Sequence, residues 1–333
     1  LHEQTPAVGA LSWIAVDQLP AAPRYAPLDR RADDAAFLQY TSGSTTEPRG
    51  VVVTHGNLLH NLELICEGFD LLQADSGTIQ TGVFWLPAYH DMGLIGGVLS
   101  PLYVGGTSYL MPPAAFLQRP LAWLETLSRT GAQISGAPNF AYELCARKAT
   151  PQQVAALDLS RWRVAFCGAE PIDATALGEF AAALGPAGFR REAFYPCYGL
   201  AEATLMVSGG GGAAAPRVMT TDRAALAAHA LEHANGSGGQ ALVSCGRPLG
   251  DQELLIVDPQ TLHPLAAGAV GEVWVRGDSV AAGYWNRPDE SQQTFAARLA
   301  DGRGPYLRTG DLGGLRDGEL FITGRLKDVI IIR

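Results

Sequence analysis

The chain has 333 residues, of which 47% are hydrophobic and 17% are charged, so it is long enough for two or three packed units with a large core. Its formal net charge of −9 argues against a general nucleic-acid binder or a membrane-surface protein. We therefore expect a small-molecule or protein partner and no nucleic acid.

The cysteines and the most apolar stretch bear on the compartment. The odd number of cysteines shows no close pairing and no metal-ligand spacing, which favours a reducing, cytoplasmic environment in which they are buried apolar residues. The most apolar stretch, residues 94–106, is interrupted by glycines and Pro101 and is too broken to span a bilayer. We expect no membrane span.

The first 207 residues alternate short apolar runs with longer amphipathic segments, which predicts an α/β fold of layered sheets flanked by helices. We expect strands at 35–40, 51–53, 83–87, 107–111, 132–136, 164–168 and 192–196, and helices at 58–72, 120–129, 140–147 and 174–184. Ligands in such sheets bind outside the carboxyl ends of the strands, where Gly168 and Tyr198 lie.

The composition changes after residue 207. Residues 208–245 are rich in glycine and alanine and contain "DRAALAAHALEHA", which we expect to be a helix within a surface insertion. Residues 246–333 contain four short strand-like runs at 253–258, 271–277, 306–313 and 318–324, separated by glycine turns. The sequence therefore predicts an α/β portion over 1–207, an insertion over 208–245 and a β-rich subdomain over 246–333.

The loop "YTSGSTTEPRG", residues 40–50, has the composition of a phosphate-binding loop. Hydroxyls and free backbone N–H groups donate to phosphate oxygens, and Arg49 adds a charge. The spacing does not match G-x-x-x-x-G-K-[ST], which argues against a P-loop kinase or ATPase. The same composition is also typical of a plain flexible loop.

Four further stretches carry candidate site residues. His90 and Asp91 lie on a turn before an apolar helix, where the alternative is a helix cap. Gly168, Ala169 and Glu170 follow a predicted strand, and small residues there let a flat ligand approach the backbone.

Tyr198 offers an aromatic face, and Glu202 offers a carboxylate four residues later; alone, Glu202 would be a carboxylate in the first turn of a helix. Asp311 and Arg325 are expected on neighbouring turns, where the alternative is a structural ion pair.

Taken in order, these motifs resemble the adenylate-forming superfamily of acyl and aryl ligases and adenylation domains. The resemblance runs from Tyr40 to Arg333. Four stretches are similar to fatty acyl-AMP ligases in particular: "YTSGSTTEPRGVVVTHGNLLHN", "LPAYHDMGLIGGVLSPLYVGG", "ISGAPNFAYELCARK" and "YPCYGLAEATLMVSGG".

The resemblance implies ATP and Mg²⁺ as cofactors, a fatty acid as substrate, and acyl-AMP and pyrophosphate as products. It implies transfer of the acyl group to the phosphopantetheine of an acyl carrier protein, in lipid, polyketide or lipopeptide biosynthesis. The roles it implies are catalysis for His90 and Glu202, magnesium binding for Glu202, nucleotide binding for Thr41, Ser42, Gly43, Ser44, Thr45, Thr46, Gly168, Ala169, Glu170, Tyr198, Gly199, Asp311 and Arg325, and a hinge for Lys327.

The chain departs from that family pattern in three places. Thr46 and Arg49 stand where many relatives have glycine and lysine. The family's catalytic lysine belongs to a C-terminal domain, and this chain stops at Arg333, just after Lys327; the family also has further sequence before the phosphate loop. We therefore expect the central piece of a larger enzyme, with weak or no adenylation by itself.

Two alternative functions stay open at the level of sequence. An acyl-coenzyme A synthetase shares every ATP motif, although residues 213–245 fall where fatty acyl-AMP ligases carry an insertion associated with poor use of coenzyme A. A non-catalytic binding module would keep the fold without the chemistry, and the presence of Glu202, Asp311 and Arg325 argues against it.

Overall fold

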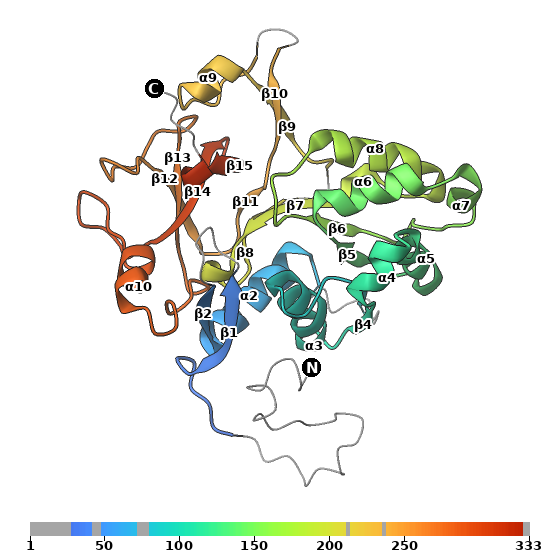
Figure 1. The fold of residues 1–333 in the computed structure, drawn as a ribbon, viewed down its shortest axis with the longest axis horizontal. Coiled ribbons are helices and arrows are strands. Elements are labelled where there is room, and N and C mark those ends of the chain that lie inside the picture. The colour runs from blue at the N-terminus through green and yellow to red at the C-terminus, as the bar shows by residue number, and fades with distance from the viewer. Residues whose placement is uncertain (1–27, 42–47, 72–79, 211–213, 235–237, 329–333) are drawn as a thin grey trace, which may run out of the picture. The chain divides into compact units, whose positions relative to one another are not determined.

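The structure is a computed structural model, and it describes residues 28–41, 48–71, 80–210, 214–234 and 238–328 (Figure 1). The chain divides into two compact units, Leu1–Arg31 and Ala32–Arg333. In the first unit only residues 28–31 are described, and they are exposed. All elements below belong to the second unit.

The larger sheet of this unit has seven strands in the order β11-β8-β7-β6-β5-β3-β4. The strands from β4 to β7 run parallel, whereas β8 and β11 are antiparallel to their neighbours. Their bounds are β3 (Thr81–Phe84), β4 (Thr107–Leu110), β5 (Ile134–Gly136), β6 (Val164–Cys167), β7 (Phe194–Gly199), β8 (Met206–Gly209) and β11 (Arg247–Pro248). The five parallel strands overlap the runs predicted from the sequence, so this part of the prediction is confirmed.

The inner strands are apolar on both faces because helices cover both. In β6, Val164 and Phe166 pack into one core while Ala165 and Cys167 pack into the other. All four side chains are buried. A strand of this kind has no polar face, which is why its sequence "VAFC" shows no hydrophobic alternation.

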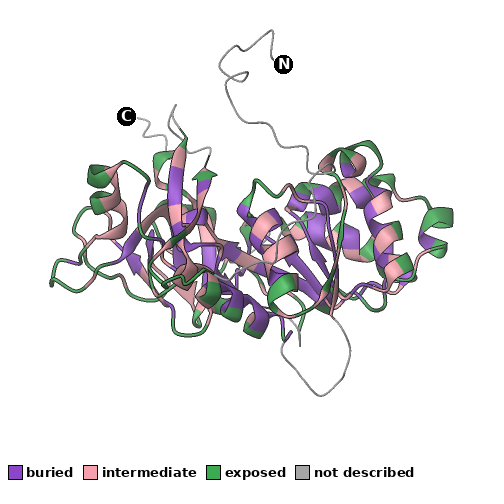
Figure 2. Ribbon diagram, turned by 90° about the horizontal axis from the view of Figure 1, so that it is seen from below, coloured by how far each residue is buried: buried purple, intermediate pink, exposed green. Residues whose placement is uncertain are grey.

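Helices lie on both faces of this sheet, and the buried residues concentrate on the strands and on the inward sides of the helices (Figure 2). One core is formed with α2 (His55–Gly68) and the π-helix η3 (Met92–Leu99), which α3 (Ser100–Tyr103) follows directly. The other core is formed with α4 (Pro113–Gln118), α5 (Leu121–Thr130), α6 (Asn139–Lys148), α7 (Pro151–Ala155) and α8 (Ala174–Leu184). The second core is aromatic, with the rings of Trp123 and Trp162 at 5.3 Å and nearly perpendicular.

Helix α2 begins three residues earlier than predicted because of its cap. The Thr54 hydroxyl accepts from the Asn57 backbone N–H at 3.1 Å, and the Asn57 side chain accepts from the Thr54 N–H at 3.1 Å. This reciprocal capping box satisfies two N–H groups that have no partner within the helix. The helix ends at Gly68 because Asp70 adopts a left-handed φ of 54°.

Strands β1 (Ala35–Thr41) and β2 (Arg49–Thr54) form an antiparallel pair in which Thr41 faces Arg49. The predicted phosphate loop joins them, so its two ends lie side by side. The strands predicted at 35–40 and 51–53 are confirmed. Ser42, Gly43, Ser44, Thr45 and Thr46 lie outside the described residues.

The second large sheet is antiparallel, with β12 (Glu253–Val257), β13 (Val270–Arg276), β14 (Leu307–Arg316) and β15 (Glu319–Arg325) in that order. Along the last pair, Leu312 faces Gly324 but Gly313 faces Ile322, so Thr323 is an extra residue on β15. This is a β-bulge. Four strands were predicted here, and four are present. Helix α10 (Pro288–Phe295) lies between β13 and β14 in the chain.

The glycine- and alanine-rich segment after β8 folds differently from the prediction. It contains a hairpin of β9 (Val218–Thr221) and β10 (Gln240–Val243) and only a short helix, α9 (Arg223–Ala227). The predicted long helix is therefore wrong. Leu231, which is fully buried, lies after α9 and packs against Val270 and Phe321 of the antiparallel sheet, so tertiary burial overrides helix propensity.

Four single turns of 3₁₀-helix complete the described elements: η4 (Gly185–Ala187), η5 (Arg191–Ala193), η6 (Ala201–Ala203) and η7 (Leu326–Asp328). Within the ranges that the structure describes, none of the helices has the length and apolarity that crossing a membrane demands.

Candidate active site

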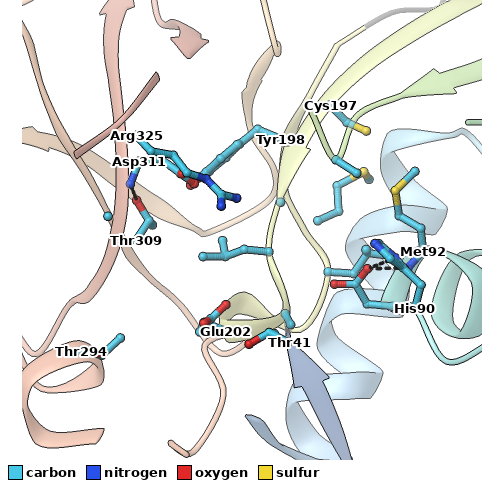
Figure 3. Close-up of a pocket in the computed structure, with 18 of the residues that line it drawn as sticks. Thr41, His90, Met92, Cys197, Tyr198, Glu202, Thr294, Thr309, Asp311 and Arg325 are labelled. Atoms are coloured by element: carbon cyan, nitrogen blue, oxygen red, sulfur yellow. Dashed lines mark hydrogen bonds and ion pairs between the residues drawn. The ribbon is translucent and has the colours of Figure 1, made fainter. Parts of the chain in front are cut away.

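A cavity of about 520 Å³ lies where the parallel sheet, the β1–β2 pair and the antiparallel sheet meet. Figure 3 shows Tyr198, Thr309, Asp311 and Arg325 on one side of it and His90 and Met92 on the other, with Glu202 and Thr41 between them. The cavity thus has a polar end and an apolar end.

Asp311 and Arg325 form the polar end. They face each other on β14 and β15 rather than on turns, so the predicted turn positions are wrong, whereas the predicted ion pair is present. Arg325 Nε lies 3.2 Å from Asp311 Oδ1, and the Tyr198 hydroxyl donates to Asp311 Oδ2 at 2.8 Å. Burial raises the pKa of Asp311, and the contacts with Tyr198 and Arg325 oppose that rise. Each carboxylate oxygen keeps a further lone pair for a ligand hydroxyl.

A second buried carboxylate fixes the backbone that leads to Asp311. Glu272 on β13 is 2% exposed and accepts from Arg308 Nη2 at 2.7 Å and from the Gly310 N–H at 3.2 Å. It also accepts from the indole N–H of Trp274 at 2.9 Å. A buried charge with several donors holds its surroundings rigidly. Sequence reasoning missed Glu272, although a single acidic residue in the apolar run "GEVWVRG" was the available signal.

Glu202 lies on the short turn η6 and lines the cavity. The sequence suggested the first turn of a longer helix, whereas the structure has only this single 3₁₀ turn. The Tyr284 hydroxyl donates to Glu202 Oε1 at 2.7 Å. Burial, followed by the charge of Glu202, raises the pKa of Tyr284, so its hydroxyl keeps the proton. The hydrogen bond from Tyr284 fixes one carboxylate oxygen of Glu202.

Tyr284 also positions Arg49, at the end of the predicted phosphate loop. The Arg49 guanidinium carbon lies 5.1 Å from the centre of the Tyr284 ring, and Arg49 Nε lies 2.8 Å from Glu290 Oε2. A stacked and paired guanidinium keeps its planar donor face in one orientation. Sequence reasoning missed Tyr284, which the motif "GYWNRPDE" shows only as one apolar residue among others.

Of the glycines and small residues predicted to bind the nucleotide, some line the cavity and others do not. Ala169, with a left-handed φ of 70°, and Gly199 line the cavity together with Thr41. Gly168 is buried and does not line it: an added Cβ would lie 2.9 Å from the Cys197 carbonyl oxygen. Glu170 points elsewhere, since its carboxylate accepts from the Phe140 N–H at 3.2 Å, in the first turn of α6.

His90 lies on the turn before η3, as predicted, and both readings of the His90–Asp91 pair have support. His90 Nδ1 lies 2.7 Å from Asp91 Oδ1, and that oxygen also accepts from the Met92 N–H at 2.7 Å, so Asp91 caps η3. The hydrogen bond to Asp91 raises the pKa of His90, while burial opposes it. His90 lines the cavity on the same side as Met92.

The apolar end lies between α2, η3 and the carboxyl ends of β6 and β7. Its lining includes Ile65, Phe69, Met92, Phe166, Leu205 and Met206. Cys197 also lines it, and burial raises the pKa of this thiol to about 12, so it is not a thiolate nucleophile. This end offers volume and apolar surface rather than chemistry.

Lys327, the predicted hinge, lies in η7 directly after β15 and lines the rim of the cavity. It follows Arg325 by two residues. The predicted hinge therefore directly follows the strand that carries Arg325 of the polar end.

The residues present fit a magnesium–nucleotide pair. Among the described residues, no cluster of three or more His, Cys, Asp or Glu side chains could hold a metal by itself. Mg²⁺ is commonly bound by one or two carboxylates together with substrate phosphates rather than by a full protein cage. Glu202 is a carboxylate on the wall of the cavity, near Thr41 at the start of the predicted phosphate loop.

The comparison with known proteins now defines the class. The sequence model of a family described as AMP-binding enzyme matches residues 3–285. The chain therefore belongs to this family, and the resemblance seen in its motifs is confirmed. The mixed α/β fold is that of the solved structure compared below.

Two relatives and one solved structure narrow the likeness. The medium-chain-fatty-acid–[acyl-carrier-protein] ligase JamA of Moorena producens (strain JHB) is 46% identical over 97% of this chain and 55% of its own length. The long-chain-fatty-acid–AMP ligase FadD26 of Mycobacterium tuberculosis (strain ATCC 25618 / H37Rv) is 42% identical over 93% of this chain and 54% of its own length. A crystal structure of a fatty acyl-adenylate ligase from L. pneumophila, in complex with acyl adenylate and pyrophosphate, matches with a TM-score of 0.86 and 46% identity, over 91% of this chain and 53% of that one. The chain spans about half the length of these proteins.

Proposed function

We propose that the complete enzyme activates a fatty acid with ATP. A carboxylate oxygen of the fatty acid attacks the α-phosphorus of ATP, the bond from that phosphorus to the pyrophosphate oxygen breaks, and acyl-AMP and pyrophosphate form. The observation that carries this proposal is one cavity that joins an apolar end to a polar end built on Asp311 and Glu202. The reaction needs both ends in contact, because its product is half acyl chain and half nucleotide.

At the polar end, Asp311 would accept hydrogen bonds from the two ribose hydroxyls, and Arg325 would hold Asp311 in place. Tyr198 would lie against the adenine. Its hydroxyl donates to Asp311, so the orientation of its ring is coupled to the ribose site. Two acceptor oxygens on one fixed carboxylate match two neighbouring hydroxyl donors.

On the phosphate side, Thr41, the loop of residues 42–46 and Arg49 would donate to the phosphate oxygens. Glu202 would hold Mg²⁺, which supplies positive charge that offsets the charge of the phosphates when bound. Donors placed in advance stabilise developing charge better than donors that must reorganise. Tyr284 contributes by holding Glu202 and Arg49 in their orientations.

His90 lies where the fatty-acid carboxylate would meet the nucleotide. Its pKa is raised, which favours the protonated ring that attracts and orients a carboxylate. Asp91 holds the imidazole at 2.7 Å. The catalysis assigned to His90 is thus orientation of the substrate by charge.

The acyl group would then pass to the phosphopantetheine thiol of an acyl carrier protein. The names of two relatives support a carrier-protein or AMP product rather than a coenzyme A product. The insertion also supports it, because Leu231 and Leu242 pack against Val270 and Phe321 and so fix the segment to the sheet that leads to the hinge.

The test offers a fatty-acid panel and ATP to the full-length enzyme, with coenzyme A and a holo carrier protein in parallel, and identifies the products by mass spectrometry. We expect acyl-AMP and acyl-carrier protein, and little acyl-coenzyme A. Absence of acyl-AMP from every fatty acid would contradict the proposed function.

A variant tests whether the insertion restrains acceptor choice. Deleting residues 213–245 would uncover Val270 and Phe321, so Leu231→Ala is the sharper change; it leaves a cavity that costs about 2–5 kcal/mol of packing. We expect unchanged acyl-AMP formation and increased acyl-coenzyme A formation. Leu184→Ala, which leaves a similar cavity in the aromatic core of the parallel sheet, is the control. Unchanged coenzyme A use with intact adenylation would mean that the insertion does not restrain the acceptor.

A further inference from the structure

A second, smaller cavity of about 20 Å³ lies behind the apolar end of the first. Two residues line both cavities: Phe69 and Gly96. The rest of its lining is largely apolar and includes Leu71, Phe84, Val104 and Ile134. The Ser100 hydroxyl, also at this cavity, already donates to the Ile95 carbonyl at 2.8 Å, so the space suits an apolar occupant.

Phe69 belongs to the wall that the two cavities share. Its ring stacks on Phe166, with centroids at 5.9 Å and planes within 10°, and meets the edge of Tyr195 at 4.8 Å. It caps the C-terminus of α2. Arg163 donates to the carbonyls of Phe69 at 2.8 Å and Asp70 at 3.1 Å. The backbone of Phe69 is therefore anchored, and rotation of its side chain would widen the connection between the cavities.

Gly96 differs from the other glycines of η3 in the space beside it. A Cβ added to Gly93 would lie 2.6 Å from the Pro87 carbonyl carbon, and one added to Gly97 would lie 3.1 Å from Phe84 Cβ. Close packing explains both. A Cβ added to Gly96 would meet no atom within 4 Å. The missing side chain at Gly96 therefore preserves open cavity rather than permitting a close contact.

We propose that Phe69 and Gly96 set the length of the acyl chain that this enzyme accepts. Gly96 leaves the passage open, and the end of an unbranched alkyl chain stops against the Phe69 ring. A longer chain displaces the ring and enters the second cavity. This inference rests on the proposed function, since it assigns the substrate of the same site.

The experiment gives the full-length enzyme an equimolar mixture of saturated fatty acids, from hexanoate to octadecanoate, with ATP, and measures each acyl-AMP by mass spectrometry. Gly96→Val fills the passage, so we expect the product distribution to move to shorter chains. One methylene excluded from an apolar pocket changes relative activation by about tenfold or more. Phe69→Leu makes the side chain in the shared wall smaller, so we expect the product distribution to move to longer chains. The size of this shift should be similar to that in Gly96→Val.

Gly178→Val is the matched control. Gly178 is also half-buried in a helix, α8, with no atom within 4 Å of an added Cβ, and it lines neither cavity. We expect the wild-type distribution from this variant. It reports any effect of placing valine in a helix.

Thermal protection of the 333-residue chain by each fatty acid gives a second readout that needs no turnover, because a ligand that binds only the folded state raises the melting temperature. Opposite shifts of chain-length preference in Gly96→Val and Phe69→Leu, in either readout, support the proposed role of these two residues. Wild-type profiles in both variants would show that the second cavity is a packing void and would overturn the inference. Loss of acyl-AMP formation and of fatty-acid protection in the wild type would instead count against the proposed function.

Discussion

The two ends of the cavity are held together by different kinds of contact. At the polar end, Tyr198, Asp311 and Arg325 are joined by hydrogen bonds and an ion pair across three strands. At the apolar end, Phe69 and Phe166 contribute shape and stacking alone. In the proposed reaction, directional contacts would suit the nucleotide, which is the constant part of the product. Volume would suit the acyl chain, which differs in length between the medium-chain and long-chain relatives.

This difference predicts that substitutions at the polar end lower activity for every fatty acid alike, whereas substitutions at the apolar end change which fatty acid is used. A change at the polar end that altered chain-length preference would break the division. The predictions below test the polar end, from the largest expected effect to the smallest.

Glu202→Gln should lower acyl-AMP formation by the full-length enzyme by roughly 100-fold or more, the scale seen when one preorganised electrostatic group is removed. The amide keeps the volume and loses the charge that a hard cation needs. Initial rates at several magnesium concentrations measure the effect. Glu253→Gln is the control, because Glu253 also accepts from a tyrosine hydroxyl, that of Tyr306 at 3.0 Å, away from the cavity. Wild-type rates in Glu202→Gln would contradict the proposed magnesium-binding role of Glu202.

Asp311→Ala should weaken ATP binding by about 1.5–3 kcal/mol, the range for hydrogen bonds to a charged group. It also leaves the buried Tyr198 hydroxyl without its acceptor, so the melting temperature should fall. Asp311→Asn keeps an acceptor there and should restore stability more than affinity. Calorimetry on the 333-residue chain separates the two effects, with the exposed Asp317→Ala as control. Unchanged nucleotide affinity in Asp311→Ala would leave Asp311 with a structural role only.

Tyr284→Phe should raise the magnesium concentration for half-maximal activity by about tenfold, because it removes the hydroxyl that orients Glu202 and keeps the ring under Arg49. Tyr306→Phe removes an equivalent tyrosine–glutamate contact elsewhere and should leave magnesium dependence unchanged. Binding of Mg²⁺ with a non-hydrolysable ATP analogue, measured by calorimetry, gives a readout that does not depend on turnover. Identical magnesium dependence in the two variants would show that Tyr284 does not position Glu202.

The smallest effect concerns pH. The folded-state pKa of His90 is raised, so its pair with Asp91 stabilises the fold fully below about pH 6.5 and loses this stabilisation as the pH rises through the folded pKa. The His90 side chain is 49% exposed, so the contribution should be below about 0.5 kcal/mol. Melting temperatures of wild type and His90→Asn should therefore differ more at low pH than at high pH. Asp91→Asn in both backgrounds should abolish the pH dependence of that difference; a difference that grows with pH would contradict the pairing.

The same division explains how much could be predicted from the sequence. Glu202, Asp311 and Arg325 stand in short local motifs, and the order of motifs also gave the fold class. The structure brings them to one cavity with Thr41, Ala169 and Tyr198. Their positions are set by nearby backbone, which a motif encodes.

Phe69 and Tyr284 were missed because their contacts join residues far apart in the chain. Phe69 in α2 meets Phe166 in β6, and Tyr284 meets Glu202. Nothing local distinguishes these side chains from ordinary core residues. The long helix expected near Leu231 was wrong for the same reason. The apolar residues there pack against strands that lie far away in the chain, rather than forming one face of a helix.

The extra residue Thr323 on β15 has one more consequence. Side chains on a strand alternate between two faces, so each inserted residue reverses the parity of all that follow. If Thr323 took part in the ladder, Gly324 would face Asp311 and Arg325 would face Gly310; because Thr323 bulges out, Arg325 faces Asp311. Deletion of Thr323 would therefore keep Arg325 opposite Asp311 in a regular ladder. A residue added to the ladder between Ile322 and Arg325 would instead move Arg325, and the predicted hinge after it, one position along β14.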